Sequence, residues 1–476
     1  MAAAAARRVI LLFFDLLLLS IFSGVAVSKT IVETLPGYPG KLPFKLETGY
    51  VGVGDSDELQ LFYYFIESER NPVRDPLLLW LTGGPGCSGF SGLVYEVGPL
   101  MFDYDAFNGS LPSFVLNPYS WTKVANMIFL DAPVGTGFSY SKTQEGYYTS
   151  DTLNVKAIYA FLRKWMVDHQ HLAFNPLYIS GDSYSGKIVP IVTLEIALGN
   201  LVHKPILNLQ GYSLGNPVTD LHSDENSRVQ YFYRVALIST ELYQEAVYLC
   251  NDEFITPDPD NAECMNAIAQ IAKCTLKVCD AQILEPKCSY ASPKPQGSLK
   301  WGNKFFDDTP IDIASPVSKG KENWCRNSNY VLSYIWANDD TVQHALGIRN
   351  GTISDWKRCN KTLAYDSDIG STVVYHKRLI KMGYRGLVYS GDHDMLIPYT
   401  GTRYWLSTLN FTIVDDWRPW YVEGQVAGFT LKYADLEGIG DGLVFATVKG
   451  AGHTAPEYKP RECFAMADRW FSYYLL

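Results

Sequence analysis

The 476-residue sequence lacks several features that would assign it to a broad functional class. It has no basic run longer than a few residues and a formal net charge of -10, which argues against nucleic acid or an anionic membrane as partner. Its nine cysteines include no C-x-x-C pair, so we expect no metal site. No internal repeat is present. A small molecule or a peptide is therefore the expected substrate, and the sequence indicates no cofactor.

Long hydrophobic runs are also missing after the first residues. There, Arg7 and Arg8 precede an apolar stretch that is interrupted only by Asp15 and ends near the small residues Ala26 and Ser28. This pattern predicts a signal peptide over residues 1–28 and a mature protein over 29–476, with an uncleaved signal anchor as the alternative. Because no later segment looks apolar enough to span a bilayer, we expect no membrane span once the signal is removed.

Entry into the secretory pathway changes how the cysteines and asparagines are interpreted. The oxidising lumen favours disulfides, and an odd total leaves at least one cysteine unpaired. Five cysteines crowd one segment and four are dispersed: Cys250, Cys264, Cys274, Cys279 and Cys288, then Cys87, Cys325, Cys359 and Cys463. Four N-x-S/T sequons predict glycosylation in this compartment, at Asn108, Asn350, Asn360 and Asn410.

Short apolar runs bounded by glycine and proline recur along the chain, with helical stretches between them. They cover residues 76–81, 127–131, 176–181, 207–215, 386–391 and 443–448. Continuous hydrophobicity, without alternation, is typical of strands buried on both faces. The sequence therefore predicts an α/β fold with a mostly parallel central sheet and helices on both faces.

The composition of the sequence changes between about residues 219 and 330. A helical, cysteine-rich piece is followed by a stretch rich in Pro, Gly, Ser and charge that lacks strand runs. We interpret 219–330 as an insertion, or lid, over the sheet. Its part 290–322 is expected to be an exposed loop that a protease could excise.

The strongest local signal is the run from Gly181 to Gly186, GDSYSG, between an apolar strand and an amphipathic helix. A nucleophile elbow needs such a tight strand-to-helix turn, which presents the Ser183 hydroxyl above the sheet. Ser185 stands where a glycine is usual. The alternative is a serine-rich turn with no catalytic role.

Two later strand ends carry an acid and a histidine in the order expected of an α/β-hydrolase. Asp392 and Asp394 follow the run 386–391, and His453 follows the run 443–448. A loop aspartate is commonly a turn residue and a lone histidine is commonly structural, but three ordered signals favour a catalytic set. A histidine that removes the serine proton, oriented by an acid, makes the serine a nucleophile.

An oxyanion hole is the remaining requirement. Gly83, Gly84 and Gly86 follow the first apolar run, where their N–H groups can approach a developing negative oxygen without hindrance from side chains. The second donor should be the N–H of Tyr184, the residue after the nucleophile.

With these residues assembled, the chain resembles the serine carboxypeptidase family from about Val32 to the C-terminus. The blocks WLTGGPGCSG, FLDAPVGTGFSYS, ISGDSYSGK, LGNPVTD, YSGDHDMLIP and KGAGHTAPEYKP look like family blocks in family order. The resemblance implies an α/β-hydrolase fold, Ser183 as nucleophile, His453 as base, Asp394 and not Asp392 as the acid, and Gly84 and Tyr184 as oxyanion donors. It also suggests the bridges Cys87–Cys359, Cys250–Cys264 and Cys288–Cys325.

Departures from the peptidase pattern concern the substrate. True carboxypeptidases resemble WLNGGPGCSS and GESYAG, whose Asn and Glu, with a Glu of an EELGP-like block, hold the carboxylate at a peptide's C-terminus. Here those places are Thr82, Asp182 and Glu96, so an amide donor is lost and a carboxyl is drawn back by one methylene. Capture of a substrate carboxylate should weaken.

Thr82 and the GDSYSG run instead look like the plant serine carboxypeptidase-like acyltransferases, which use 1-O-β-glucose esters as donors. The resemblance implies that Ser183 takes the acyl group and passes it to an acceptor alcohol or amine. From their places beside the nucleophile, we expect Thr82, Gly83, Asp182 and Glu96 to contact substrate. A hydrolytic carboxypeptidase and a non-catalytic binding homologue are the alternatives. The family's sorting suggests the vacuole or the cell exterior, and a shared proton between Asp182 and Glu96 suggests a mildly acidic to neutral working pH.

Overall fold

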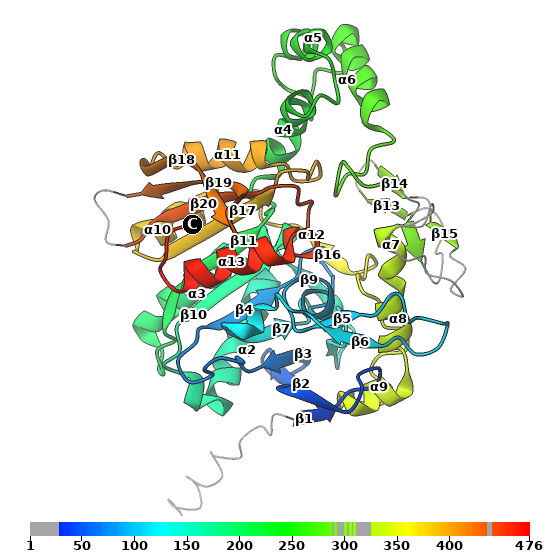
Figure 1. The fold of residues 1–476 in the computed structure, drawn as a ribbon, viewed down its shortest axis with the longest axis vertical. Coiled ribbons are helices and arrows are strands. Elements are labelled where there is room, and N and C mark those ends of the chain that lie inside the picture. Colours follow the sequence, from blue (N-terminus) through cyan, green and yellow to red (C-terminus); the bar gives the residue numbers. More distant parts are fainter. Residues whose placement is uncertain are drawn as a thin grey trace, which may run out of the picture.

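The computed structural model describes residues 28–287, 290–292, 299–301, 304–306, 308–310, 325–435 and 440–476 (Figure 1). The predicted signal peptide, except its last residue, lies outside the described residues. Cys288, one half of a suggested bridge, and most of the loop 290–322 lie outside them as well.

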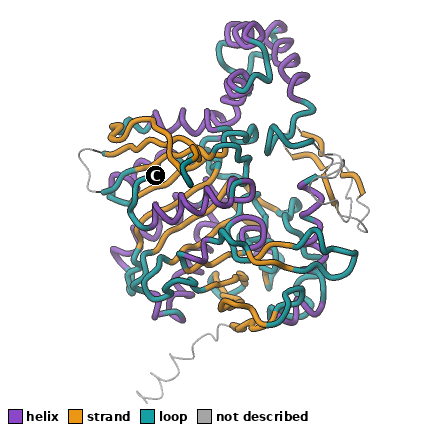
Figure 2. Tube along the Cα trace, viewed as in Figure 1, coloured by secondary structure: helices purple, strands orange, loops and turns teal. Residues whose placement is uncertain are grey.

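A 12-stranded mixed sheet crosses the described part of the molecule (Figures 1 and 2). Its order is β1-β2-β3-β7-β4-β10-β11-β17-β20-β19-β18, with β8 beside β3. The six central strands are parallel: β7 (Asn126–Leu130), β4 (Leu77–Leu81), β10 (Leu177–Asp182), β11 (Leu209–Gly215), β17 (Arg385–Gly391) and β20 (Leu443–Val448). They are the six apolar runs of the sequence, so the predicted α/β architecture is confirmed.

Antiparallel strands extend the sheet at both edges. They are β1 (Ser28–Thr34), β2 (Lys41–Val53), β3 (Leu59–Ile66) and β8 (Tyr140–Ser141) at one edge, and β18 (Thr412–Val422) and β19 (Gln425–Ala434) at the other. Smaller pairs join β5 (Leu100–Phe102) to β6 (Phe114–Leu116) and β9 (Tyr148–Ser150) to β16 (Ala364–Asp366).

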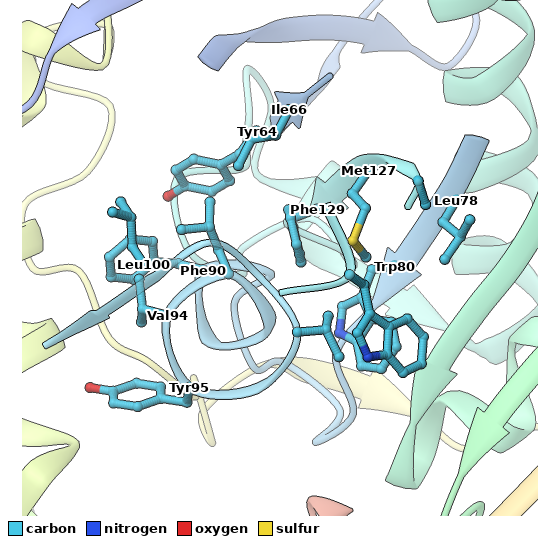
Figure 3. Close-up of a cluster of buried hydrophobic side chains, with 14 of the residues drawn as sticks. Tyr64, Ile66, Leu78, Trp80, Phe90, Val94, Tyr95, Leu100, Met127 and Phe129 are labelled. Atoms are coloured by element: carbon cyan, nitrogen blue, oxygen red, sulfur yellow. The ribbon is translucent and has the colours of Figure 1, made fainter. Parts of the chain in front are cut away.

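Helices cover both faces of the sheet. Successive residues of a strand point to opposite sides, so an unbroken apolar run presents apolar side chains on both faces. Leu77, Leu79 and Leu81 of β4 pack in one buried cluster with helices α2 (Asp151–Asp168), α3 (Val189–Val202), α10 (Val373–Lys381) and α11 (Tyr399–Thr408). Leu78 and Trp80 pack in the other, with α8 (Val331–Ala337), α9 (Asp340–Ala345) and α13 (Pro460–Phe471). Figure 3 shows part of this second cluster, to which Trp80, Phe129, Val94 and Tyr95 belong.

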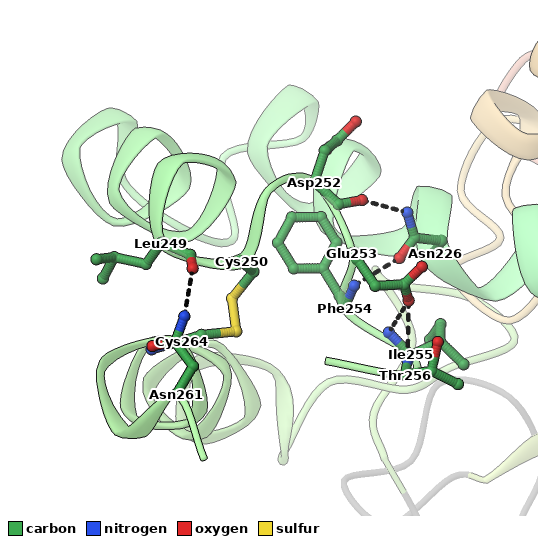
Figure 4. The surroundings of a disulfide bond; sticks show 10 residues. All are labelled: Asn226, Leu249, Cys250, Asp252, Glu253, Phe254, Ile255, Thr256, Asn261 and Cys264. Atoms are coloured by element: carbon green, nitrogen blue, oxygen red, sulfur yellow. Dashed lines mark hydrogen bonds between the residues drawn. A yellow bond between two sulfur atoms is a disulfide. The ribbon is translucent and has the colours of Figure 1, made fainter. Parts of the chain in front are cut away.

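The insertion has a small core of its own. Its helices α4 (Leu221–Arg234), α5 (Thr240–Cys250) and α6 (Ala262–Thr275) bury Phe232, Ala246, Phe254 and Ile271, and Figure 1 shows α5 and α6 projecting from the body of the molecule. A disulfide joins Cys250 to Cys264 at the facing helix ends (Figure 4). The chain returns to the body through α7 (Arg326–Asn329), and α12 (Ala455–Tyr458) precedes α13.

Two sequence expectations need correction. The stretch after α6 was expected to lack strands, but it contains β12 (Tyr290–Ser292), β13 (Leu299–Trp301), β14 (Lys304–Phe306) and β15 (Asp308–Pro310), each too short to show a periodic pattern. Among the described residues, Ser183–Val202 is also long and apolar enough, by length and composition, to cross a membrane. Since 67% of its apolar 18-residue window is buried, it serves here as a helix of the protein core.

Candidate active site

Ser183 lies on a sharp turn at the carboxyl end of β10. The strand ends at Asp182, and a 3-10 turn, Ser183–Lys187, leads into α3. Ser183 has a φ of 55°, a left-handed conformation that is strained for any residue with a side chain. The turn needs close neighbours without side chains, since a Cβ on Gly83 would lie 2.6 Å from the Ser183 Cβ. Ser185 is accommodated because its hydroxyl donates to the Leu81 carbonyl at 2.8 Å.

A hydrogen-bonded chain connects the three loops that follow β10, β17 and β20. His453 Nε2 lies 2.8 Å from Ser183 Oγ, and His453 Nδ1 lies 2.8 Å from Asp394 Oδ2. With Nδ1 protonated, the imidazole donates to Asp394 and leaves Nε2 free to accept the serine proton. Asp394 is fully buried, whereas Ser183 is half-buried and reachable. The structure thus brings the three sequence candidates together.

Asp394 is held by partners that the sequence analysis missed. Asn216 Nδ2 donates to Asp394 Oδ2 at 2.8 Å, and the N–H of Leu396 donates to Asp394 Oδ1 at 2.7 Å. Asn216 follows β11, the strand between those that carry the serine and the acid. Its place in the LGNPVTD block, just past an apolar run, was the available signal.

The electrostatics of His453 suit a general base. Burial lowers its pKa, but the charge and hydrogen bond of Asp394, with the charge of Asp182, outweigh burial and raise the pKa above its ordinary value. A raised pKa makes the imidazole a better proton acceptor once it is neutral.

Asp392, the other candidate acid, does not contact the histidine ring. Its Oδ1 accepts a hydrogen bond from the Gly450 N–H at 2.6 Å, so it connects the loop after β17 to the loop that carries His453. The hydrogen bond from His453 to Asp394 agrees with the family resemblance, which implied Asp394, and not Asp392, as the catalytic acid.

Gly84 and Tyr184 are the oxyanion donors that the family resemblance implies. Tyr184 is the second residue of its turn, where an N–H has no acceptor within the helix. Its phenol donates to Asp151 Oδ1 at 2.9 Å, which fixes the residue from outside the turn. The Gly83 N–H is already used, because it donates to Asp182 Oδ1 at 3.1 Å. Of the glycine pair, Gly84 is therefore the one whose N–H is available.

The loop after β4 that carries Gly84 is anchored twice. A disulfide joins Cys87 to Cys359, and the buried Asp131 accepts hydrogen bonds from the Ser88 hydroxyl at 2.5 Å and the Gly89 N–H at 2.9 Å. Both bridges that the resemblance suggested within the described residues are present. Cys274, Cys279 and Cys463 are free among the described cysteines.

The buried carboxyls of Asp182 and Glu96, with the half-buried Thr82, form a polar group beside the nucleophile. Glu96 ends a π-helical turn, Gly92–Glu96, and Asp182 and Glu96 are only 3% and 5% exposed. Burial raises the pKa of Asp182 to about 6. Burial, together with the charge of Asp182, raises the pKa of Glu96 well above its usual value. The pair therefore holds at least one proton at neutral pH, and Thr82 Oγ1 and Glu96 Oε2 have no hydrogen-bond partner among the described residues.

The remaining site predictions concern glycosylation and metal binding. Three of the four sequon asparagines are exposed, namely Asn108, Asn350 and Asn410. Asn360 is half-buried, and its Nδ2 donates to the Gly135 carbonyl at 2.9 Å, so a glycan there would displace this bond. Within the described ranges, no group of three or more His, Cys, Asp or Glu side chains could hold a metal ion.

The central sheet, the serine turn and the hydrogen-bonded chain together define an α/β-hydrolase. The chain belongs to the serine carboxypeptidase family, whose model matches residues 36–473. Serine carboxypeptidase-like 2 of Arabidopsis thaliana is 47% identical over 446 residues, covering 94% of this chain and 93% of that protein. Serine carboxypeptidase-like 16 of the same plant is 47% identical over 460 residues, covering 96% and 97%.

A solved structure agrees on the fold. The prohormone-processing carboxypeptidase KEX1(ΔP) of Saccharomyces cerevisiae matches with a TM-score of 0.70 and 19% identity, covering 94% of this chain and 95% of that one. At that identity the likeness extends to the fold alone.

Proposed function

We propose that this protein is an acyltransferase of the serine carboxypeptidase family. It moves an acyl group from a 1-O-β-glucose ester to an acceptor alcohol or amine through an acyl-enzyme on Ser183. The observation that supports transfer over peptide hydrolysis is the polar group beside the nucleophile. Where the peptidase pattern has an amide and a longer acid, this chain has a hydroxyl and an aspartate whose carboxylate accepts the Gly83 N–H.

The chemistry uses the hydrogen-bonded chain twice. Ser183 Oγ attacks the ester carbonyl while its proton moves to His453 Nε2, and the N–H groups of Gly84 and Tyr184 stabilise the oxyanion. The intermediate collapses, and glucose leaves with the proton held by His453. The acceptor hydroxyl or amine then gives a proton to His453, attacks the acyl carbon and returns the serine to its starting state. Asp394 holds the imidazole tautomer throughout.

The charge of the polar group favours a neutral leaving group. Above pH 6 Asp182 carries a negative charge, and a substrate carboxylate placed beside it would be repelled. Sugar hydroxyls can both donate to the Asp182 carboxylate and accept from the protonated Glu96 or the Thr82 hydroxyl. Glucose can therefore form hydrogen bonds with these groups, whereas the C-terminal carboxylate of a peptide would face the negative charge of Asp182.

The test supplies the purified protein with an aromatic acyl glucose and a set of acceptor alcohols and amines, and separately with a blocked dipeptide. New ester or amide and free glucose support transfer, whereas release of an amino acid supports the carboxypeptidase alternative. No reaction with either, and none with Ser183→Ala, supports a binding homologue and contradicts the proposal.

A pair of substitutions tests the polar group directly. Thr82→Asn with Asp182→Glu restores the peptidase pattern and is expected to raise dipeptide hydrolysis while weakening acyl-glucose turnover. Thr82→Ser, which keeps the hydroxyl, serves as the matched control.

A further inference from the structure

A short segment of the insertion, residues 280–285, lies against both catalytic loops. The N–H of Met395, next to the acid, donates to the Asp280 carbonyl at 3.0 Å. The N–H of His453 itself donates to the Ala281 carbonyl at 2.8 Å. The N–H of Ile283 returns a bond to the His393 carbonyl at 3.1 Å. Three residues of one segment thus hold the chain on either side of Asp394 and at His453.

The side chain of Gln282 adds a fourth connection. It is 4% exposed, and its Nε2 donates to the Gly450 carbonyl at 3.1 Å, in the loop that carries His453. The approach is close enough to require glycine beside the histidine, since a Cβ on Gly452 would lie 2.3 Å from the Ala281 carbonyl oxygen. The loop after β20 is therefore shaped to receive this segment.

The far end of the segment is fastened by a partly buried ion-pair network. Glu285 accepts two hydrogen bonds from the Arg326 guanidinium, at 2.6 and 3.0 Å. The same guanidinium donates to Glu457 Oε1 at 3.1 Å, and Glu457 Oε2 accepts from the hydroxyl of Thr454, the residue after His453, at 2.8 Å. Arg326 is only 16% exposed, which strengthens these charged contacts.

We propose that residues 280–285, which we name the clasp, position His453 against Asp394, with Gln282 and Arg326 as positioning residues. The inference rests on the proposed roles of Ser183, His453 and Asp394. The acid and the base stand in the loops that follow β17 and β20. Asp392 already joins these loops through the Gly450 N–H, and the relative placement of acid and base depends also on what else spans the two loops. The clasp spans both, and it comes from the insertion, outside the sheet. A segment from outside the catalytic strands thereby contributes to the geometry of the pair.

The experiment measures reaction of Ser183 with a fluorophosphonate probe, which needs the serine and histidine but no knowledge of the natural substrate. The serine oxygen bonds to phosphorus, fluoride leaves, and His453 takes the serine proton. Arg326→Lys keeps the charge but loses the two-pronged contact, and Gln282→Met removes the amide at nearly constant volume. Arg70→Lys is the control, because Arg70 also donates twice to one carboxylate, to Asp75 Oδ1 at 2.7 and 3.0 Å, in the loop before β4 begins.

We expect Arg326→Lys and Gln282→Met each to slow labelling about tenfold, as a displaced base would. We also expect the midpoint of the labelling rate against pH to move to lower pH. When Asp394 is held less firmly against His453, it raises the pKa of His453 less. Asp182 and Arg228, the other charged groups that act on His453, are unchanged in these variants. The control should label at the wild-type rate even where its unfolding temperature falls.

The inference would be overturned if folded Arg326→Lys and Gln282→Met both showed the labelling rate and pH midpoint of the wild type. An equal loss of labelling rate in Arg70→Lys would also overturn it. If the wild type and Ser183→Ala label alike, the proposed function fails too. Labelling that depends on Ser183 but is indifferent to the clasp leaves the proposed function standing and removes the clasp alone.

Discussion

Asn216 and His453 donate to the same oxygen of Asp394, each at 2.8 Å. Asn216 also accepts the Gly391 N–H at 3.0 Å through Oδ1, and its own backbone φ is 41°. One side chain therefore connects the strand before the acid to the acid itself.

Replacing Asn216 should lower turnover with little change in substrate affinity. Asn216→Gly tolerates the left-handed backbone but removes the donor to Asp394, a charged contact worth about 1.5–3 kcal/mol, so kcat should fall about tenfold to a hundredfold. Steady-state kinetics on the confirmed substrate separates kcat from KM. A rise in KM at unchanged kcat would contradict a role in holding the acid.

Binding of the donor should depend on pH through Asp182. An ionised carboxylate accepts a sugar hydroxyl more strongly than a carboxylic acid does, so affinity should rise as pH rises through about 6. Because Asp182 and Glu96 interact, the midpoint belongs to the pair. Calorimetry of acyl-glucose binding to Ser183→Ala, where no turnover occurs, measures this step. Adding Asp182→Asn should flatten the curve, and an unchanged curve would rule out contact between Asp182 and glucose.

The two described disulfides should differ in their effect on reactivity. Opening Cys87–Cys359 by a double change to serine frees the loop that carries Gly84, so probe labelling should fall about tenfold along with stability. Opening Cys250–Cys264, at the tip of the insertion, should cost stability and leave labelling within about twofold. Labelling rates and unfolding temperatures of the two variants, measured together, decide between these expectations.

A buried cluster far from the nucleophile should control acid stability. Glu47, only 3% exposed, accepts from the Tyr63 hydroxyl and faces His169 Nε2, both at 2.8 Å. Burial raises the pKa of Glu47, but the bonds from His169 and Tyr63 outweigh it and hold the pKa below 4.5. A lowered carboxyl pKa contributes stability that is fully present above the unfolded value and is lost as pH falls through the folded one.

Glu47→Gln should therefore destabilise the fold by about 3 kcal/mol at neutral pH, since it breaks a buried charged contact. The difference from wild type should shrink on acidification below about pH 4. Denaturant unfolding at the two pH values measures it, and a difference that is independent of pH would contradict the assignment.

The central strands and the catalytic candidates were predictable because each has a local signature. A strand buried on both faces has an apolar run, and the serine turn and the glycine-rich loop of His453 have compositions that few other structures need. The clasp was not predictable, because its contacts use the carbonyls of Asp280 and Ala281, and every residue has a carbonyl. Asn216 stood in a visible block, but only the distance to Asp394 shows what it holds.

The contact between Glu285 and Arg326 bears on maturation. These residues border the stretch that we expect a protease to remove, and they meet across 41 positions of sequence. A cut between them would produce two fragments that the ion pair of Glu285 and Arg326 still joins. Cleavage would therefore leave His453 in its place beside Asp394. The mature enzyme would then tolerate loss of the intervening peptide, while mispairing at this contact would slow it.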